Sequence, residues 1–251
     1  MQAGMYIAYT GARAAEKRLE QVANNLANIS SVGYKQDKSI DSGVVPAASL
    51  AGIDPSAASG AMPGGQLLYS TPAMQYVDMN AGPLRTTGKP TDLAIEGEGF
   101  FTVRTKDGDR LTRAGNFRID AAGDLATVDG GKVLGAGGPI HIGDGVPAVT
   151  SDGQVAVDGN VVGTLLVQKV PDPTVLKKEG HSLFLVPPGT ALSPAGAGAR
   201  IEQGSVEEAN VSAITGMTEM VEASRMFDAY MKMMSTISDL NSKASNDLGR
   251  V

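Results

Sequence analysis

The chain has 251 residues and a formal net charge of −6 at pH 7. Its basic residues are scattered, whereas nucleic-acid binding needs a concentrated positive face, so composition argues against a nucleic-acid partner. The sequence contains no cysteine and no apolar run near the roughly 18 residues of a membrane span, so we expect neither disulfides nor membrane insertion.

The first predicted element is an N-terminal helix within residues 1–32. Small or apolar side chains recur there at alternating spacings of three and four residues: Met5, Ala8, Ala12, Ala15, Leu19, Val22, Leu26 and Ile29. A repeat averaging 3.5 residues keeps one stripe of a helix, its seam, against a partner helix. We expect the helix to stop before Gly33, because glycine readily adopts the left-handed conformation that ends helices.

Residues 33–80 predict an extended connector rather than part of a packed core. Clusters of alanine, serine, glycine and proline at 47–49, 56–60 and 63–65 are typical of turns. The best strand candidates in the connector are residues 67–69 and 74–77, which would form a loose hairpin.

Residues 81–203 predict an all-β domain of short hairpins, either a barrel or a folded sheet. The pattern favours strands near 93–95, 100–103, 117–119, 155–157, 164–167 and 183–186. Asp-Gly pairs, which are strong hairpin signals, occur at 107–108, 129–130, 144–145, 152–153 and 158–159.

Residues 204–251 predict a C-terminal helix that begins near Ser205, with Glu207 and Glu208 in its first turn, where negative charge favours the helix dipole. Its seam comprises Met220, Ala223, Phe227, Tyr230, Met234, Ile237, Asn241, Ala244 and Leu248. The predicted fold class is therefore α+β, with long N- and C-terminal helices pairing as an antiparallel coiled coil around an inserted, hairpin-rich all-β domain. On this geometry the small-residue start of the first seam faces Ala244 and Leu248.

Residues suited to catalysis or metal binding are sparse. His141 and His181 lie in separate turn-rich places, and neither is accompanied by cysteine or a cluster of carboxylates. An acidic carbohydrate-processing enzyme would need Asp92, Glu96 and Glu98 on one face of a strand, but the glycines among them favour a turn. We therefore expect no enzyme activity, no catalytic residue, no cofactor and no metal.

Two residue types in the helices allow more than one interpretation. Six methionines crowd the C-terminal helix, and adaptable packing among similar helices is favoured over a peptide groove. Asn24, Asn25 and Asn28 lie near the end of the first helix, although asparagine is a poor helix former. They either help to end the helix or hydrogen-bond to a neighbouring subunit, and the sequence leaves both interpretations open.

Several stretches closely resemble the flagellar rod and hook protein family. They are Asn24–Asn28, Gly33–Lys35, Thr91–Phe101, Leu111–Phe117 and Gln203–Val211. The matching stretches span nearly the whole chain in the family's order. Two departures, Val206 where leucine is usual and Ala209 where serine is usual, are conservative in size.

The resemblance implies a structural subunit of the bacterial flagellar basal-body rod. It implies assembly with other rod proteins and copies of itself, around a central export channel, in the part of the rod that spans the periplasm. It also implies passage through the flagellar type III export apparatus without a cleaved signal peptide, in agreement with an N-terminus that has no basic leading region. The ending Leu248–Val251 resembles the proximal-rod member; a distal-rod subunit and a stand-alone oligomeric scaffold are the alternatives.

The candidate site is an assembly interface along the two helical seams and the residues that follow the first helix. Its predicted members are Leu19, Val22, Asn24, Asn25, Leu26, Asn28, Ile29, Tyr34, Met220, Phe227, Tyr230, Met234 and Ile237.

Overall fold

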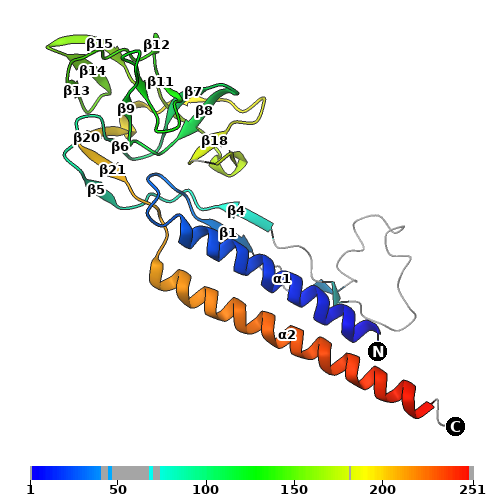
Figure 1. Ribbon diagram of the computed structural model, residues 1–251. Helices are drawn as coiled ribbons and strands as arrows, with labels where there is room; N and C mark the ends of the chain where they lie inside the picture. The colour runs from blue at the N-terminus through cyan, green and yellow to red at the C-terminus, as the bar shows by residue number, and fades with distance from the viewer. Residues whose placement is uncertain (1, 41–44, 47–67, 70–73, 181, 249–251) are drawn as a thin grey trace. The chain divides into compact units, whose positions relative to one another are not determined.

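The computed structural model describes residues 2–40, 45–46, 68–69, 74–180 and 182–248 (Figure 1). Helix α1 (Gln2–Ala27) lies near the start of the chain, helix α2 (Ala213–Leu248) near its end, and the middle is mostly β. This arrangement confirms the predicted order of helices and β structure. In the part of the chain that the structure describes, neither helix has the long apolar stretch that a membrane crossing requires.

The chain divides into two compact units. The helical unit comprises the described residues of Met1–Leu26, Asp37–Tyr76 and Ser212–Val251, and the β unit comprises those of Ala27–Gln36 and Val77–Val211. The last residue of α1 and the nine residues that follow it thus belong to the β unit, although the predicted β domain began only at residue 81.

Within the helical unit, α1 and α2 lie side by side and run in opposite directions (Figure 1). Three neighbouring pairs define the register: Gly4 with Ile237, Gly11 with Tyr230, and Leu26 with Gly216. The start of α1 therefore faces Tyr230 and Ile237 rather than the predicted Ala244 and Leu248, whose side chains lie outside the described residues. The physical reason is the glycine at position 11, which leaves the space that the Tyr230 ring occupies.

The predicted seams are the buried stripes of both helices. On α1, Ala8, Ala12, Ala15 and Val22 are buried, and Met5, Leu19 and Leu26 are half-buried. On α2, Ala223 is buried, and its other described seam residues, from Met220 to Asn241, are half-buried. Most of the remaining side chains on α2 are exposed, so the 3.5-residue spacing identified the face that each helix turns inward.

Two short strand pairs accompany the helices. Strand β1 (Asp37–Ile40) pairs with β4 (Met74–Val77), and β2 (Val45–Pro46) pairs with β3 (Leu68–Tyr69). The strands expected near 67–69 and 74–77 therefore exist, but each pairs with an earlier strand instead of with the other. The predicted turn-rich clusters at 47–49, 56–60 and 63–65 lie outside the described residues.

The largest sheet of the β unit has ten strands, in the order β17-β18-β8-β7-β11-β10-β9, with β12 beside β11, β16 beside β7, and β19 beside β16. Their bounds are β7 (Phe100–Thr105), β8 (Gly108–Thr112), β9 (Arg118–Ile119), β10 (Leu125–Ala126), β11 (Lys132–Gly135), β12 (Gly138–Pro139), β16 (Val167–Lys169), β17 (Lys177–Lys178), β18 (Leu183–Leu185) and β19 (Ser193–Pro194). Two 3₁₀ turns, η3 (Pro173–Val175) and η4 (Gly196–Gly198), lie in its connections.

A second sheet and two ladders complete the β unit. Antiparallel strands β13 (Pro147–Val149), β14 (Gln154–Val157) and β15 (Asn160–Thr164) form the second sheet. The ladders pair β5 (Leu84–Thr86) with β21 (Ser205–Glu207), and β6 (Leu93–Glu96) with β20 (Arg200–Gln203). They join the beginning of the β-rich middle to its end.

Apolar side chains from both sheets meet in one core, which includes Leu93, Phe101, Val133, Val155 and Leu165. Four of the five Asp-Gly pairs connect strands that are partners in a sheet, as predicted. Positive φ angles at Asp158 and Gly159, 50° and 83°, match the type I′ turn that such a pair favours. The pair at 144–145 instead precedes β13, which does not pair with β12.

The C-terminal helix begins later than the sequence suggested. Ser205–Glu207 form β21, and α2 starts at Ala213 after Ser212, whose hydroxyl accepts a hydrogen bond from the Thr215 amide at 3.4 Å. Glu207 is therefore not a first-turn residue of the helix. Its carboxylate is buried by partners distant in sequence, which a local pattern does not contain.

Candidate functional site

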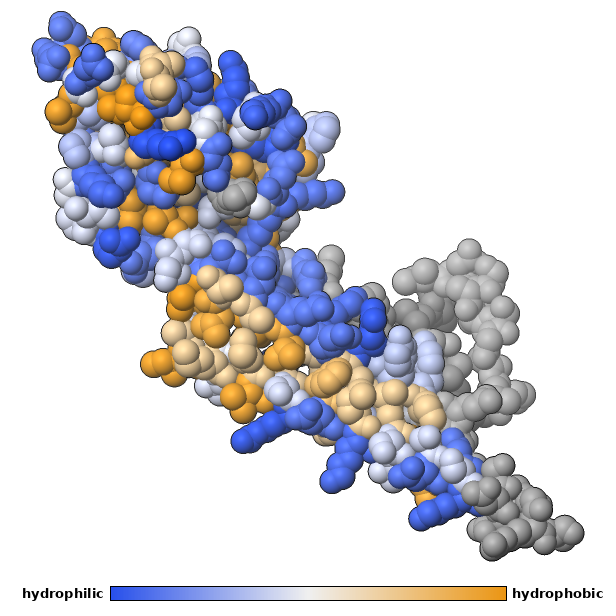
Figure 2. Space-filling model, viewed as in Figure 1, coloured by the Kyte–Doolittle hydropathy of each residue, from blue (hydrophilic) through white to orange (hydrophobic). Residues whose placement is uncertain are grey.

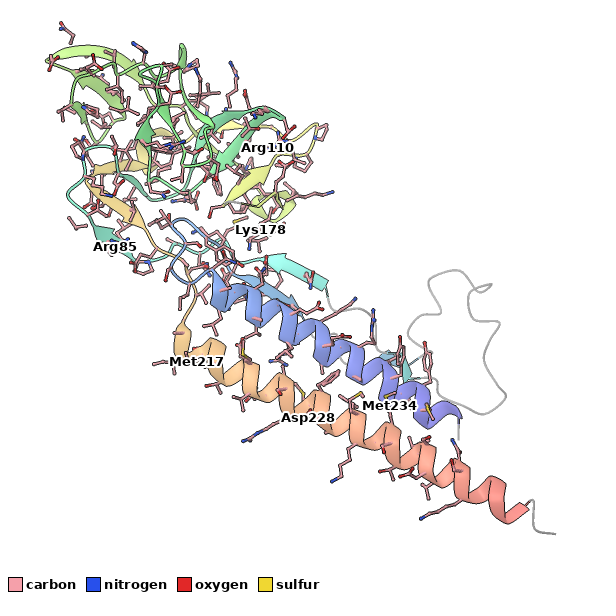
Figure 3. The ribbon with its side chains drawn as sticks, in the orientation of Figure 1. Arg85, Arg110, Lys178, Met217, Asp228 and Met234 are labelled. Carbon is pink, nitrogen blue, oxygen red and sulfur yellow. The ribbon has the colours of Figure 1, made fainter. Side chains whose placement is uncertain are left out.

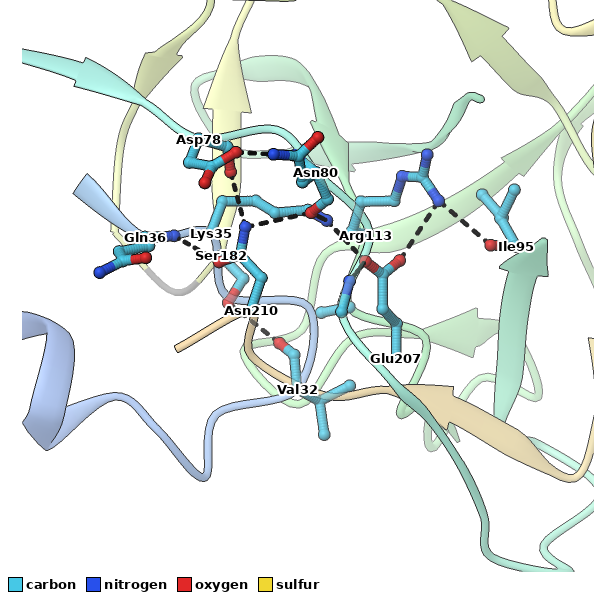
Figure 4. Close-up of polar contacts among 12 residues, drawn as sticks. Val32, Lys35, Gln36, Asp78, Asn80, Ile95, Arg113, Ser182, Glu207 and Asn210 are labelled. Carbon is cyan, nitrogen blue, oxygen red and sulfur yellow. Dashed lines mark hydrogen bonds and ion pairs between the residues drawn. The ribbon is translucent and has the colours of Figure 1, made fainter. Parts of the chain in front are cut away.

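A buried cluster of three charged side chains lies between chain segments that flank the β-rich middle (Figure 4). Glu207 Oε1 accepts a hydrogen bond from Lys35 Nζ at 2.5 Å and another from the Gly82 amide at 2.9 Å. Its other oxygen, Oε2, accepts from Arg113 Nη1 at 3.2 Å. The side chains of Lys35 and Glu207 are each 1% exposed and that of Arg113 is 7% exposed, so water contributes little to their solvation.

Backbone carbonyls supply further hydrogen-bond acceptors for the two cations. Lys35 Nζ also donates to the carbonyl of Asn80 at 2.8 Å, and Arg113 donates to the carbonyls of Ile95 and Gly97 at 3.1 and 2.7 Å. The Arg113 guanidinium also lies 5.3 Å from the centre of the Phe100 ring, a cation–π distance. These contacts replace much of the water that both cations lose.

The cluster holds two cations for one anion. Burial lowers the pKa of Lys35, an effect that the Glu207 carboxylate opposes and the Arg113 charge reinforces. Burial likewise lowers the pKa of Arg113, again against the attraction of Glu207. Both shifts have the same cause, since desolvation penalises the charged form of a base.

Asn210 joins the same segments through its amide group. Its Oδ1 accepts from the Gln36 amide at 2.7 Å, and its Nδ2 donates to the carbonyls of Asp78 and Asn80 at 2.8 and 3.0 Å. Its own backbone amide donates to the Tyr34 carbonyl at 3.4 Å. We call Gly33–Gln36, Asp78–Gly82, Arg113 and Glu207–Asn210 together the terminal junction.

Gly33 has a specific structural role in the terminal junction. Its amide donates to the Glu207 carbonyl at 2.7 Å, its φ is +65°, and a Cβ there would overlap the backbone of Ala114. Both the turn and the close approach therefore require glycine. Nearby, the Ser182 hydroxyl donates to the Val32 carbonyl at 3.1 Å, a contact from a segment outside the terminal junction.

Tyr34, a predicted assembly residue, is buried in the β unit. Lys178 Nζ lies 4.1 Å from the centre of its ring and also donates to the carbonyl of Lys35 (Figure 3). From the sequence, Gly33 was expected to end the first helix and Tyr34 to lie in the assembly interface, and Lys35 had no predicted role beyond the family resemblance. The structure shows that all three residues hold the segment after α1 against the β unit.

The three asparagines near the end of α1 have different environments. Asn25 is buried, its Oδ1 accepts from the Asp37 amide at 3.0 Å, and its Nδ2 donates to the Asp37 carbonyl at 2.8 Å. Asn28 Oδ1 accepts from the Ser31 hydroxyl at 3.2 Å in the turn after the helix. Asn24 is exposed on α1. Asn25 thus fixes strand β1 beside the helix in its own chain.

The predicted seam residues lie on the buried stripes described above, apart from Ile29, which is half-buried in the β unit. Several other apolar residues of α2 are exposed, including Ile214, Met217, Val221, Met226 and Leu240. Figure 2 shows apolar residues gathered over the first half of α2. Met234 is half-buried in the seam, whereas Met217 and Asp228 on the same helix are exposed (Figure 3).

The carboxylates considered for catalysis do not form a common site. Asp92 is buried and accepts a hydrogen bond from the Thr87 hydroxyl at 2.7 Å, whereas Glu98 is exposed and pairs with Lys169. His141 is exposed beside Asp124. Among the described residues, no group of three histidine or acidic side chains is arranged to hold a metal ion.

Three family models match the chain. The flagella basal body rod protein model matches residues 5–35, and the D1 domain model of flagellar hook protein FlgE/F/G matches residues 94–163. The C-terminal model of flagellar basal body rod FlgEFG proteins matches residues 202–247. Lys35, Arg113 and Glu207 lie one in each of these three segments, so every matched segment contains one member of the buried ion cluster.

Curated relatives match over nearly the whole chain. The flagellar basal-body rod protein FlgF of Caulobacter vibrioides is 30% identical over 256 residues and covers 100% of both chains. FlgF of Mesorhizobium japonicum is 30% identical and covers 99% of each. FlgG of Bacillus subtilis is 30% identical and covers 96% of this chain and 97% of its own.

The chain belongs to the flagellar basal-body rod protein family, a class of structural proteins and not enzymes. Within that family it is most like the FlgF type. The resemblance stated from its motifs is thereby confirmed.

Proposed function

We propose that this protein is a subunit of the proximal rod of the flagellar basal body, assembled through its two terminal helices. The exposed apolar surface of α2 carries the proposal: Ile214 is 82% exposed, Met217 57% and Val221 50%. An apolar surface of this kind on a helix typically marks a contact with another protein. Neighbouring rod subunits, the partners that the relatives' names indicate, are the occupants that we propose.

The α1–α2 pair is proposed to act as a coiled coil whose seams are completed on assembly. Met220, Phe227, Tyr230, Met234 and Ile237 are only half-buried in the single chain, so a neighbouring helix can cover the rest of each. On α1, we propose that the half-buried Leu19 and Leu26 make the corresponding contacts, whereas Val22 is already buried in the single chain. Many modest contacts of this kind add up along an assembly and give it strength.

The terminal junction is proposed to pass torque between the helices and the β unit. The chain enters the junction directly after α1 and leaves it shortly before α2. Its ion pairs are buried, so these pairs and the hydrogen bonds beside them hold the two segments together whatever covers the exposed surface. A force applied along either helical segment is therefore proposed to reach the β unit at one place.

The outward face of the β13-β14-β15 sheet is the proposed contact of the β unit with a neighbouring subunit. Val155 and Val157 of β14 face the core, yet Val161 of the neighbouring strand β15 is 64% exposed. Strands that are apolar on both faces are typical of sheets that are covered on both faces. Residues 133–167 contain three aspartates and no lysine or arginine, so we propose that the neighbour presents a basic surface.

The route to the rod and its location follow from the same proposal. We propose export through the flagellar type III apparatus, without a cleaved signal peptide, and a place in the periplasm-spanning part of the rod around its central channel. A distal-rod subunit is the alternative within the same family, which also includes FlgG of Bacillus subtilis.

Photo-crosslinking in purified basal bodies tests the proposal. A photoreactive residue at Met217 is expected to yield crosslinks to other rod subunits, and one at Val161 is expected to crosslink a neighbouring β unit. The exposed, charged Asp228 of α2 serves as the matched control and is expected to crosslink less. Absence of the protein from the particles would refute the proposed function, whereas crosslinks mainly to hook-junction proteins would move the protein to the distal rod.

A further inference from the structure

In the terminal junction, each segment supplies hydrogen-bond partners to backbone groups of the other segments. Residues after α1, residues 78–83 and residues 207–210 exchange six hydrogen bonds through their backbone amides. The donors are Gly33 to Glu207 O (2.7 Å), Gln36 to Asn210 Oδ1 (2.7 Å), Asp78 to Gln36 O (2.8 Å), Gly82 to Glu207 Oε1 (2.9 Å), Glu208 to Pro83 O (2.9 Å) and Asn210 to Tyr34 O (3.4 Å).

Releasing any one segment would leave buried polar groups on the other two without partners. If residues 33–36 detached, Glu207 would lose the Lys35 ammonium, and Asn210 Oδ1 would lose the Gln36 amide. A buried donor or acceptor that loses its partner bears its full desolvation cost, so partial opening is disfavoured relative to complete opening. The geometry thus favours cooperative opening of all three segments.

The three charged residues of the cluster do not contribute equally to its stability, because two are cations and one is an anion. Neutralising Glu207 would leave two buried cations, Lys35 and Arg113, with no anion between them. Neutralising Lys35 would instead leave one cation paired with one anion. Since an uncompensated buried charge is strongly unfavourable, Glu207 is the member whose loss costs most.

We propose that Lys35, Arg113 and Glu207 form an electrostatic lock, centred on Glu207, that makes the three segments of the terminal junction open and close as one unit. The lock lies wholly within the β unit, and it therefore operates in the unassembled subunit. Its three segments lie beside three of the four places at which the chain passes between the β unit and the helical unit. This inference does not rest on the proposed function.

Hydrogen exchange of the full-length, unassembled protein in low denaturant tests the lock without any variant. The amides of Gly33, Gly82 and Asn210 come from the three different segments and are expected to share one opening free energy and one denaturant dependence. Three distinct opening energies would overturn the proposal. Because this measurement needs only the wild-type chain, it stands even if a variant does not fold.

Variants then test the central place of Glu207. We expect Glu207→Gln to lower protection at all three amides at least tenfold, and Lys35→Met to lower it less. Adding Lys35→Met to Glu207→Gln is expected to restore part of the loss, because it removes one of the two uncompensated cations. The matched control is Arg85→Gln, which breaks an exposed ion pair with Glu208 on the adjacent β5–β21 ladder and is expected to change none of the three.

Two outcomes would contradict the lock. One is a loss of protection confined to Gly33 and Gly82, which bond directly to Glu207, while Asn210 is unaffected. The other is a double variant with lower protection than Glu207→Gln alone, which would show that Lys35 contributes packing rather than charge.

Discussion

The ring of Tyr230 on α2 lies directly against Gly11 on α1, at a place where any side chain on α1 would occupy the same space. A glycine inside a helix costs about 1 kcal/mol relative to alanine. The ring explains why α1 carries one there, because it occupies the space that a side chain on Gly11 would need. A small-residue stripe on α1 thus matches a bulkier stripe on α2.

Gly11→Ala is therefore expected to destabilise the helical unit. The new methyl group would gain helix propensity but would collide with the Tyr230 ring, and overpacking of this kind typically costs about 1–3 kcal/mol. Urea denaturation followed by far-UV circular dichroism measures the loss. Gly4→Ala is the matched control, since a Cβ there would lie 3.6 Å from Ile237 Cδ1, an ordinary contact. The two substitutions should shift stability in opposite directions, and equal shifts would contradict the assignment.

Asn25→Ala is expected to loosen strand β1 from helix α1. The substitution removes both hydrogen bonds to the backbone of Asp37, each worth about 1 kcal/mol, and leaves the partly buried Asp37 amide with one partner fewer. Hydrogen exchange at the Asp37 amide should therefore accelerate.

A graded variant sharpens the Asn25 test. Asn25→Asp keeps an oxygen that accepts from the Asp37 amide but loses the donor to the Asp37 carbonyl, so its effect should lie between wild type and alanine. Glu20→Ala on the exposed face of α1 controls for changes in helix propensity. Unchanged exchange at Asp37 in Asn25→Ala would mean that the strand is held elsewhere.

The stability contribution of Lys35 should improve as pH rises. Burial places the pKa of Lys35 below its ordinary value of 10.5, so the unfolded chain binds more protons than the folded chain between the two values. The difference in unfolding free energy between wild type and Lys35→Met should therefore move in favour of wild type as pH approaches 10.5. Glu207, Arg113 and Asp78 are the charged groups that act on Lys35 and are unchanged in the comparison.

Lys132 supplies a control of opposite sign. Its hydrogen bond with Asp124 raises the pKa of Lys132, so its contribution is complete below the unfolded value and is lost as pH rises through the folded value. Denaturation of wild type, Lys35→Met and Lys132→Met across the alkaline range distinguishes the two. A Lys35 contribution that declines with pH would show that attraction by Glu207 outweighs burial.

Local patterns predicted the parts of this fold that depend on neighbours in sequence. The seam spacing identified both helices and their buried faces, because helical periodicity brings residues three and four apart to one side. Asp-Gly pairs located four hairpins, because the glycine of each pair adopts a positive φ angle, which is a local requirement of the turn.

The terminal junction could not be predicted in this way. Lys35 and Glu207 meet across 172 residues of sequence, and nothing near either residue indicates the other. Two adjacent glutamates before an apolar run look like the start of a helix, yet long-range pairing with Lys35 and Arg113 places Glu207 in a strand. The family resemblance marked the correct stretches but gave no reason for them. For three of them, Gly33–Lys35, Leu111–Phe117 and Gln203–Val211, that reason is their meeting at the buried Glu207 carboxylate.

The ladders β5–β21 and β6–β20 form a double-stranded stem at the base of the β unit. Glu96 pairs with Arg200 at one end of the stem and Leu84 pairs with Glu207 at the other. The two ladders therefore enclose residues 97–199, the segment that contains both sheets of the β unit. The stem is not independent of the residues that it encloses, because Arg113, which lies among them, donates to the Glu207 carboxylate at one end of the stem and to the Ile95 carbonyl within it.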